Sequence, residues 1–292
     1  MSQDLYKHVY SVLHWMTEKE QQHLLPGGRM MLSPEEYTTR LDYYPVYSHK
    51  KADRRKIADI TIGAHGIPGL KTVHRYLTLG LYPSQFKAGE FEHLQALLDL
   101  YLDDINYAKL YAYGKVNHLE LASDTLTQKH HSFIAYRKYC SKSHIYKDDD
   151  GYLGTTYIGS LESDLFFRVY DKRKQLLDKQ KPLITDSPVH TRIEVAMGRL
   201  KRSPASLIHM SNPFSKLQVT ELEQAKALSD DQNWQNFLTA CLTADGAPDA
   251  LAALPAYTRT KYLGMLDDVP AWWWKPDLIW ERLPEALARI AP

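Results

Sequence analysis

The chain has 292 residues, of which 44% are hydrophobic and 24% are charged, and its formal net charge is +1. This composition is that of a globular protein with a hydrophobic core, and the length suits one large domain or two ordinary ones. No apolar run approaches the roughly 18 residues of a membrane-spanning helix, and the polar start of the chain lacks a signal-peptide stretch. Cys140 and Cys241 lie far apart without metal-ligand spacing, which argues against a disulfide scaffold or structural zinc and for the cytoplasm.

The periodicity of apolar residues predicts the elements in chain order. An amphipathic helix over residues 3–24 is followed by short strands within 36–80 and a second amphipathic helix that ends near Asp104. Further strands are predicted at about 114–123, 153–159, 164–170 and 189–197, and helical patterns dominate after residue 203. We therefore predict an α+β fold, with an antiparallel-sheet domain over residues 1–205 and a smaller helical C-terminal domain over residues 206–292.

Three consecutive tryptophans, Trp272–Trp274, lie in the predicted helical part. Adjacent residues of a helix do not share one face, so the three rings cannot all be buried together. We expect this tail to pack onto the sheet domain, with a partner or DNA-stacking surface as the alternative.

Basic side chains gather in the middle of the chain. Residues 125–147 hold no acidic residue, and two further basic runs follow near residues 170 and 200. Tyrosines are interleaved in the first run, and basic clusters with aromatic rings suit a phosphate backbone and stacked, unpaired bases. One such cluster alone equally suits a solvated face, but three favour DNA. The candidate DNA contacts in the first run are Lys129, Arg137 and Lys138.

Three predicted strands have an apolar face and a polar face of unusual composition. Successive side chains of a strand point to opposite faces of the sheet. The polar faces hold, strand by strand, His118, Glu120 and Asp124; Asp164, Arg168 and Tyr170; and Arg192 and Glu194. Ordinary surface strands also alternate between apolar and polar residues, but their polar faces far less often combine acids, arginines and a tyrosine. If these strands are neighbours in one sheet, their polar faces converge on one site.

Such a site has the parts for cutting a phosphodiester bond. Carboxylates bind Mg²⁺ or Mn²⁺, arginines such as Arg168 and Arg192 hold phosphate oxygens, and a tyrosine can attack phosphorus. A free tyrosine has a pKa of about 10 and needs a neighbouring cation or metal ion to react near neutrality. Arg168 and Lys172 flank Tyr170 and are predicted to supply that charge. Tyr157 is the rival nucleophile, with a ring stacked on the sheet as its ordinary role.

The segment from Gly154 to Gln175 resembles the signature of the replication initiation factor (Rep_trans) family, which serves rolling-circle plasmids and some filamentous phages. The residues that carry this resemblance are Tyr157, Gly159, Ser160, Ser163, Asp164, Arg168, Tyr170, Asp171 and Lys172. A strand with Glu120 and Asp124 precedes the segment, and an Arg192-x-Glu194 strand follows it, in the family's order. His118 and Glu120 stand where the family usually has arginine and aspartate.

The resemblance implies a metal-dependent, site-specific nicking-closing endonuclease that starts rolling-circle replication in the bacterial cytoplasm. Tyr170 would become a 5′-phosphotyrosine and leave a 3′-OH primer, while Glu120 and Asp124, with Glu194, would bind Mg²⁺ or Mn²⁺. The implied partners are origin DNA with a single-stranded or cruciform nick site, a second copy of the chain in a homodimer, and a host helicase. A conjugative relaxase and a non-catalytic origin- or operator-binding protein remain open as alternatives.

Overall fold

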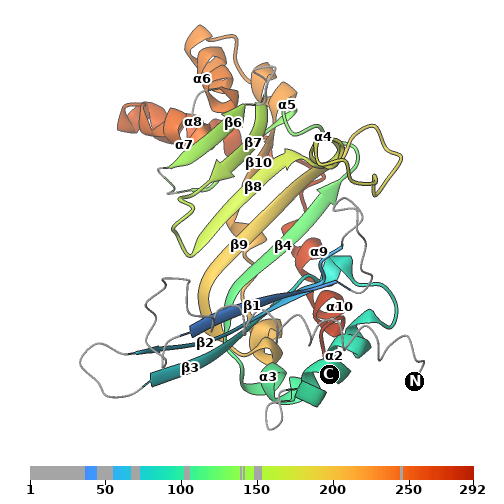
Figure 1. Ribbon diagram of the computed structural model, residues 1–292. Coiled ribbons are helices and arrows are strands. Elements are labelled where there is room, and N and C mark those ends of the chain that lie inside the picture. The colour runs from blue at the N-terminus through green and yellow to red at the C-terminus, as the bar shows by residue number, and fades with distance from the viewer. Residues whose placement is uncertain are drawn as a thin grey trace, which may run out of the picture. The chain divides into compact units, whose positions relative to one another are not determined.

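The computed structural model describes residues 37–44, 55–66, 73–101, 106–138, 140, 142–147, 153–243 and 246–292. The helix predicted over residues 3–24 therefore lies outside the described residues. The chain divides into two compact units, Met1–Ala108 and Lys109–Ala291, and their elements are labelled in Figure 1. In the described part of the chain, no helix has the length and apolar character required to span a bilayer.

The first unit contains a three-stranded antiparallel sheet of order β1-β2-β3. Its elements are β1 (Tyr37–Tyr43), β2 (Ala58–Gly66), β3 (Val73–Leu81), the short 3₁₀ helix η2 (Pro83–Gln85) and α2 (Glu90–Tyr101). In α2, Leu94 and Leu98 are buried one turn apart, as the amphipathic pattern predicts. The strands and the helix predicted between residues 36 and 104 are thus confirmed within the described residues, and the predicted helix end near Asp104 lies outside them. The helix α3 (Tyr107–Tyr113) leads into the second unit.

The second unit is built on a five-stranded antiparallel sheet of order β4-β9-β8-β7-β6, whose strands lie side by side in Figure 1. Its strands are β4 (Val116–Thr125), β6 (Ser143–Lys147), β7 (Leu153–Ile158), β8 (Leu165–Asp171) and β9 (Thr191–Arg202). Four of the five match the predicted strands, and β6 was not predicted. A two-stranded sheet formed by β5 (Phe133–Tyr136) and β10 (Gln218–Glu221) was not predicted either.

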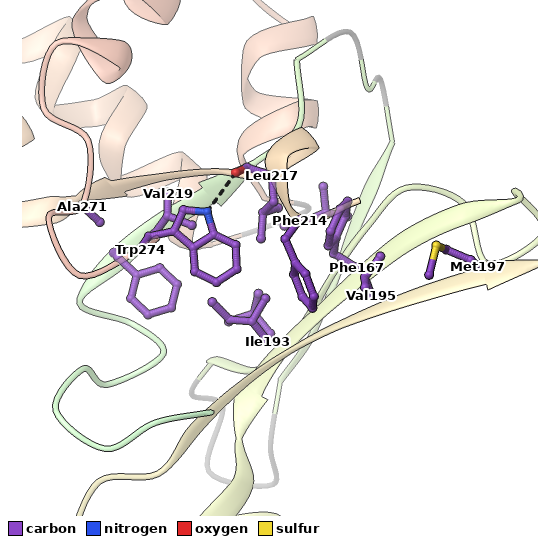
Figure 2. Packing of buried hydrophobic residues seen from close by; sticks show 12 residues of the cluster. Phe167, Ile193, Val195, Met197, Phe214, Leu217, Val219, Ala271 and Trp274 are labelled. Carbon is purple, nitrogen blue, oxygen red and sulfur yellow. Dashed lines mark hydrogen bonds between the residues drawn. The ribbon is translucent and has the colours of Figure 1, made fainter. Parts of the chain in front are cut away.

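The apolar face of the five-stranded sheet packs against segments from the C-terminal part of the chain. Phe167 from β8 and Val195 from β9 have no exposed surface and share a core with Phe214, Leu217 and Trp274. Figure 2 shows this core and the hydrogen bond that Trp274 Nε1 donates to the Leu217 carbonyl, 3.1 Å away. The predicted packing of the tryptophan tail onto the sheet is confirmed at Trp274.

Helices dominate after residue 203, as predicted. They are α5 (Leu222–Ala227), α6 (Gln232–Leu242), α7 (Ala247–Ala252), α8 (Ala256–Asp267), α9 (Pro276–Trp280) and α10 (Leu283–Ala288), with 3₁₀ turns η3 (Pro204–His209) and η4 (Phe214–Lys216). A second core around Trp234 joins α5–α8 to β5. The fold is therefore α+β, with an antiparallel sheet and a helical C-terminal region. A separate domain over residues 206–292 stays a prediction.

Candidate active site

The polar faces of four neighbouring strands form one surface of the five-stranded sheet, because the strand register aligns them. Residues directly opposite each other in antiparallel strands have their side chains on the same face. One row across the strands is Tyr157–Arg168–Glu194–Ala122, and the next is Thr155–Tyr170–Arg192–Asp124. Glu120 lies opposite Ala196, one step from the first row. The convergence that the alternation predicted is thus present.

Arg168 lies between two carboxylates of this surface. Its Nη2 is 2.8 Å from Glu120 Oε2 and 2.8 Å from Glu194 Oε2. Burial works against its charge, but Glu194 and Glu120 outweigh it and raise the pKa of Arg168 above its ordinary value. Its buried Nε has no acceptor among the described residues, so one N–H donor of this guanidinium is left unpaired.

Arg192 forms a bidentate pair with Asp124 in the next row. Arg192 Nε is 2.6 Å from Asp124 Oδ1 and Arg192 Nη2 is 2.7 Å from Asp124 Oδ2. Partial burial opposes ionisation of Asp124, yet Arg192 and then His190 hold its pKa below the ordinary value.

His190 belongs to this site, although we did not predict it from the sequence. The residue is 3% exposed, and its Nε2 lies 3.3 Å from Asp124 Oδ2. His190, Arg192 and Glu194 are spaced two residues apart, so the strand alternation that predicts Arg192 and Glu194 on the polar face also predicts His190 when it is continued by one step toward the N-terminus. Its carbonyl also accepts the Lys172 N–H at 2.7 Å, which ties β9 to the start of α4 (Lys172–Asp178).

Tyr170 lies on the polar face, but it is only 5% exposed. Its hydroxyl donates a 2.8 Å hydrogen bond to Glu194 Oε1. Burial, followed by the charge of Glu194, raises the pKa of Tyr170 above its ordinary value, against the smaller effects of Arg192 and Arg168. The flanking cations therefore do not make this phenol acidic, contrary to the expectation from the sequence.

Lys172, at the first position of α4, lies over the Tyr170 ring with its Nζ 5.7 Å from the ring centroid. Burial and then Arg192 lower the pKa of Lys172 to about 8. Its Nζ also donates to Gln175 Oε1 at 2.7 Å. An ammonium group with a pKa near neutrality is a competent proton donor at physiological pH.

The three predicted metal ligands, Glu120, Asp124 and Glu194, do not form a cluster that fits a metal ion as they are placed. Among the residues that the structure describes, no group of three His, Cys, Asp or Glu side chains is arranged to hold one. Arg168 separates Glu120 from Glu194, and Arg192 occupies both oxygens of Asp124. Binding of Mg²⁺ or Mn²⁺ would require these arginines to give up their contacts, and it stays a prediction.

Of the four basic residues predicted to contact DNA, Arg192 lies on this surface, whereas the other three flank β5 and are not part of it. Arg137 donates to the Leu165 carbonyl at 3.3 Å, and Lys138 pairs with Asp267 at 2.7 Å. Lys129 is exposed in the loop before β5. DNA binding by these residues stays a prediction.

Four aromatic rings continue the polar face toward its β6 edge, and they were not singled out together from the sequence. His144 and Tyr146 come from β6, Tyr157 from β7 and Phe166 from β8. Neighbouring ring centroids lie 4.4 Å apart for His144–Tyr146, 5.3 Å for Tyr146–Tyr157 and 6.4 Å for Tyr157–Phe166. We call these four residues the aromatic row.

A scan against protein-family models and a search of curated proteins find no match. A search of solved structures finds the "Rolling Circle Replication Initiator Protein from Geobacillus stearothermophilus", which is 13% identical with a TM-score of 0.31. The match covers 72% of this chain and 83% of that chain. A TM-score this low carries no argument, so the functional proposal depends on the site and on the sequence motif.

The geometry of the site pairs a hydroxyl group with a base. The Tyr170 hydroxyl is hydrogen-bonded to a carboxylate, and that carboxylate is oriented by Arg168. A nucleophile, a base within hydrogen-bond reach and a third group that orients the base form the usual arrangement for nucleophilic catalysis. Two guanidinium groups beside them suit the non-bridging oxygens of a phosphate.

Proposed function

We propose that this protein nicks one strand of DNA with Tyr170 and thereby initiates rolling-circle replication. The observation that carries the proposal is the hydrogen bond from Tyr170 to Glu194 on a sheet face that also holds Arg168 and Arg192. The tyrosine lies in the sequence segment that resembles the replication initiation factor family, which adds independent support. The proposed substrate is origin DNA with an unpaired or cruciform nick site.

In the proposed reaction, the Tyr170 oxygen attacks phosphorus while its proton passes to Glu194. Because the pKa of Tyr170 is raised, the hydroxyl needs Glu194 as a base to become a nucleophile. The bond from Tyr170 to phosphorus forms and the bond from phosphorus to the 3′ oxygen breaks. The products are a 5′-phosphotyrosine and a free 3′-OH, and Lys172 donates the proton that the leaving oxygen takes up.

The two arginines hold the phosphate in this scheme. The Arg168 Nε is buried and lacks an acceptor among the described residues, and a phosphate oxygen would supply one once the groups that cover this atom move. Since Tyr170 is 5% exposed, the scissile phosphate reaches its hydroxyl only when the side chains that cover the residue move. A divalent cation bound by Glu120, Asp124 or Glu194 would add positive charge that polarises the phosphate. A homodimer, a host helicase and a cytoplasmic location belong to the same proposal through the family resemblance.

A non-catalytic origin- or operator-binding protein is the second candidate. The burial of Tyr170 and the raised pKa of its hydroxyl favour it, because both oppose nucleophilic attack. A conjugative relaxase has no observation that favours it over a replication initiator.

Incubation with supercoiled plasmid that carries the cognate origin, in Mn²⁺, separates the candidates. We expect open circles and a covalent protein–DNA adduct with the natural protein, and neither with Tyr170→Phe. Tyr157→Phe is the matched control and should keep nicking. An adduct that persists in Tyr170→Phe and is lost in Tyr157→Phe would transfer the role to Tyr157. Intact supercoils with a stable gel shift would instead support the binding protein, and peptide mapping of the adduct identifies the linked residue directly.

A further inference from the structure

The aromatic row does not belong to the hydrophobic core. Its residues alternate along the strands with buried residues such as Ile145, Ile158 and Phe167, of which Ile158 and Phe167 belong to the core. The row therefore lies on the opposite, polar face, where Tyr146 is 51% exposed and His144 is also exposed. The four rings are in none of the core clusters found among the described residues, and aromatic rings gathered on a partly exposed sheet face are a typical binding surface.

The aromatic row adjoins the proposed active site. Tyr157 lies directly opposite Arg168 in the strand register, and Arg168 Cζ lies 5.9 Å from the centroid of the Phe166 ring. The same Arg168 contacts Glu194, which accepts the Tyr170 hydrogen bond. A single arginine therefore bridges the rings and the nucleophile–base pair.

The charge of the surrounding strands suits a polyanion. Neither β6 nor β7 contains an acidic residue, and Lys142 and Lys147 are exposed at the two ends of β6. A surface with aromatic rings and neighbouring cations fits bases next to a phosphate chain. Paired bases keep their faces inside the duplex, so only unpaired bases can stack on these rings.

We propose that the aromatic row binds the unpaired bases next to the scissile phosphate, with Tyr146 and Tyr157 as stacking residues. This inference rests on the proposed DNA-nicking function and assigns Tyr157 to DNA binding. Stacking on aromatic side chains is tolerant of sequence because every base has a π face. The row holds the strand while Arg168 places its phosphate at Tyr170.

Fluorescence anisotropy with a labelled oligo-dT tests this proposal without knowledge of the origin sequence. Removal of one stacking ring typically weakens binding by about 5- to 150-fold, so we expect a loss of this size for Tyr146→Ala. Tyr146→Phe keeps the ring and should bind within about twofold of the natural protein. Tyr257→Ala is the matched control, because Tyr257 is 83% exposed on α8 and lies outside the row.

An oligonucleotide of the same length with abasic sites separates stacking from phosphate contacts. It should bind the natural protein more weakly than oligo-dT, and Tyr146→Ala should cause little further loss. The slope of log Kd against log salt should be the same for Tyr146→Ala and the natural protein, because no phosphate contact is removed. Equal binding of oligo-dT by Tyr146→Ala and the natural protein, or equal affinity for abasic DNA and oligo-dT, would overturn the inference. The same would follow if Tyr146→Ala weakened duplex binding just as much.

The same experiments distinguish failure of the stacking proposal from failure of the proposed nicking function. A protein that binds oligo-dT through Tyr146 but never cuts origin DNA would refute nicking and keep the stacking surface. A protein that nicks origin DNA normally but binds oligo-dT equally well without Tyr146 would refute the stacking surface and keep the nicking function.

Discussion

The pair of Asp124 and Arg192 gives a quantitative test of the site geometry. Asp124→Asn keeps the size of the side chain and one acceptor oxygen, but it removes the charge and one of the two short hydrogen bonds to Arg192. Arg192 is only 17% exposed at its side chain, so it keeps a largely desolvated charge with a weaker partner. We expect this variant to be clearly less stable than the natural protein.

The expected loss follows from the geometry and the exposure. Hydrogen bonds to charged groups contribute about 1.5–3 kcal/mol each, but the Asp124 side chain is 35% exposed, and water screens part of the interaction. We expect a loss of about 2 kcal/mol in the free energy of unfolding, or roughly 4–8 °C in melting temperature for a unit of this size. In a double-mutant cycle with Arg192→Gln, the coupling energy should be about 1 kcal/mol or more.

Urea unfolding followed by tryptophan fluorescence measures this change, because urea leaves ion pairs unscreened. All tryptophans except Trp15 lie within Lys109–Ala291, so the signal reports mainly on the unit that holds the site. The pKa of Asp124 is lowered in the folded state. Its contribution is therefore fully present above the ordinary pKa of about 3.9 and disappears as the pH falls through the lower folded value. The gap between the two proteins should be widest near pH 7 and should close in acid.

Asp164→Asn is the matched control. Asp164 pairs with Arg199, but their side chains are 62% and 68% exposed, so the loss should stay below about 1 kcal/mol. Additive effects of Asp124→Asn and Arg192→Gln within about 0.5 kcal/mol would refute the argument. A stability gap that persisted unchanged at acid pH would refute it as well, because Asp124 would then not be the ionised partner.

Two further predictions concern Lys172 and the cation. Lys172→Met should raise the melting temperature at pH 7. Burial and Arg192 lower the Lys172 pKa to about 8, which means that the charged ammonium group is disfavoured in the folded state. The gain in melting temperature should therefore shrink as the pH rises from about 8 to about 10.5. The same variant should slow nicking, and an unchanged melting temperature at pH 7 would show that Lys172 is not desolvated. Nicking should stop in EDTA and return with Mn²⁺ or Mg²⁺. Glu120→Gln should raise the Mn²⁺ concentration needed for half-maximal activity, whereas Glu223→Gln, on α5 and outside the site, should not; full activity in EDTA would contradict both expectations.

Sequence periodicity was sufficient to predict which residues share the polar face. The strands β4, β8 and β9 are amphipathic, and alternation places Glu120, Arg168 and Glu194 on the polar side whatever the pairing. Register depends on contacts between distant segments, however, so the sequence alone did not show that Arg168 lies opposite Glu194 or that Arg192 lies opposite Asp124. These pairings decide which carboxylates are bound by arginine.

Burial is the second property that local patterns did not reveal. The cations next to Tyr170 in the sequence suggested an acidic phenol, but the environment of the folded sheet raises its pKa. The strands β5 and β6 span only Phe133–Tyr136 and Ser143–Lys147, and strands this short show no clear alternation of apolar and polar residues. Both lie within residues 125–147, where the absence of acidic residues is the most prominent feature of the sequence. For this reason the sequence alone does not predict the aromatic row, although it singles out Tyr157.

The two sides of the five-stranded sheet have a consequence for shortened forms of the protein. Phe214, Leu217 and Trp274 cover the side opposite the proposed nucleophile. A chain that ended at residue 205 would lose all three and leave Phe167 and Val195 in contact with water. Such a fragment is expected to aggregate, even though it would retain every residue that we assign to DNA cleavage.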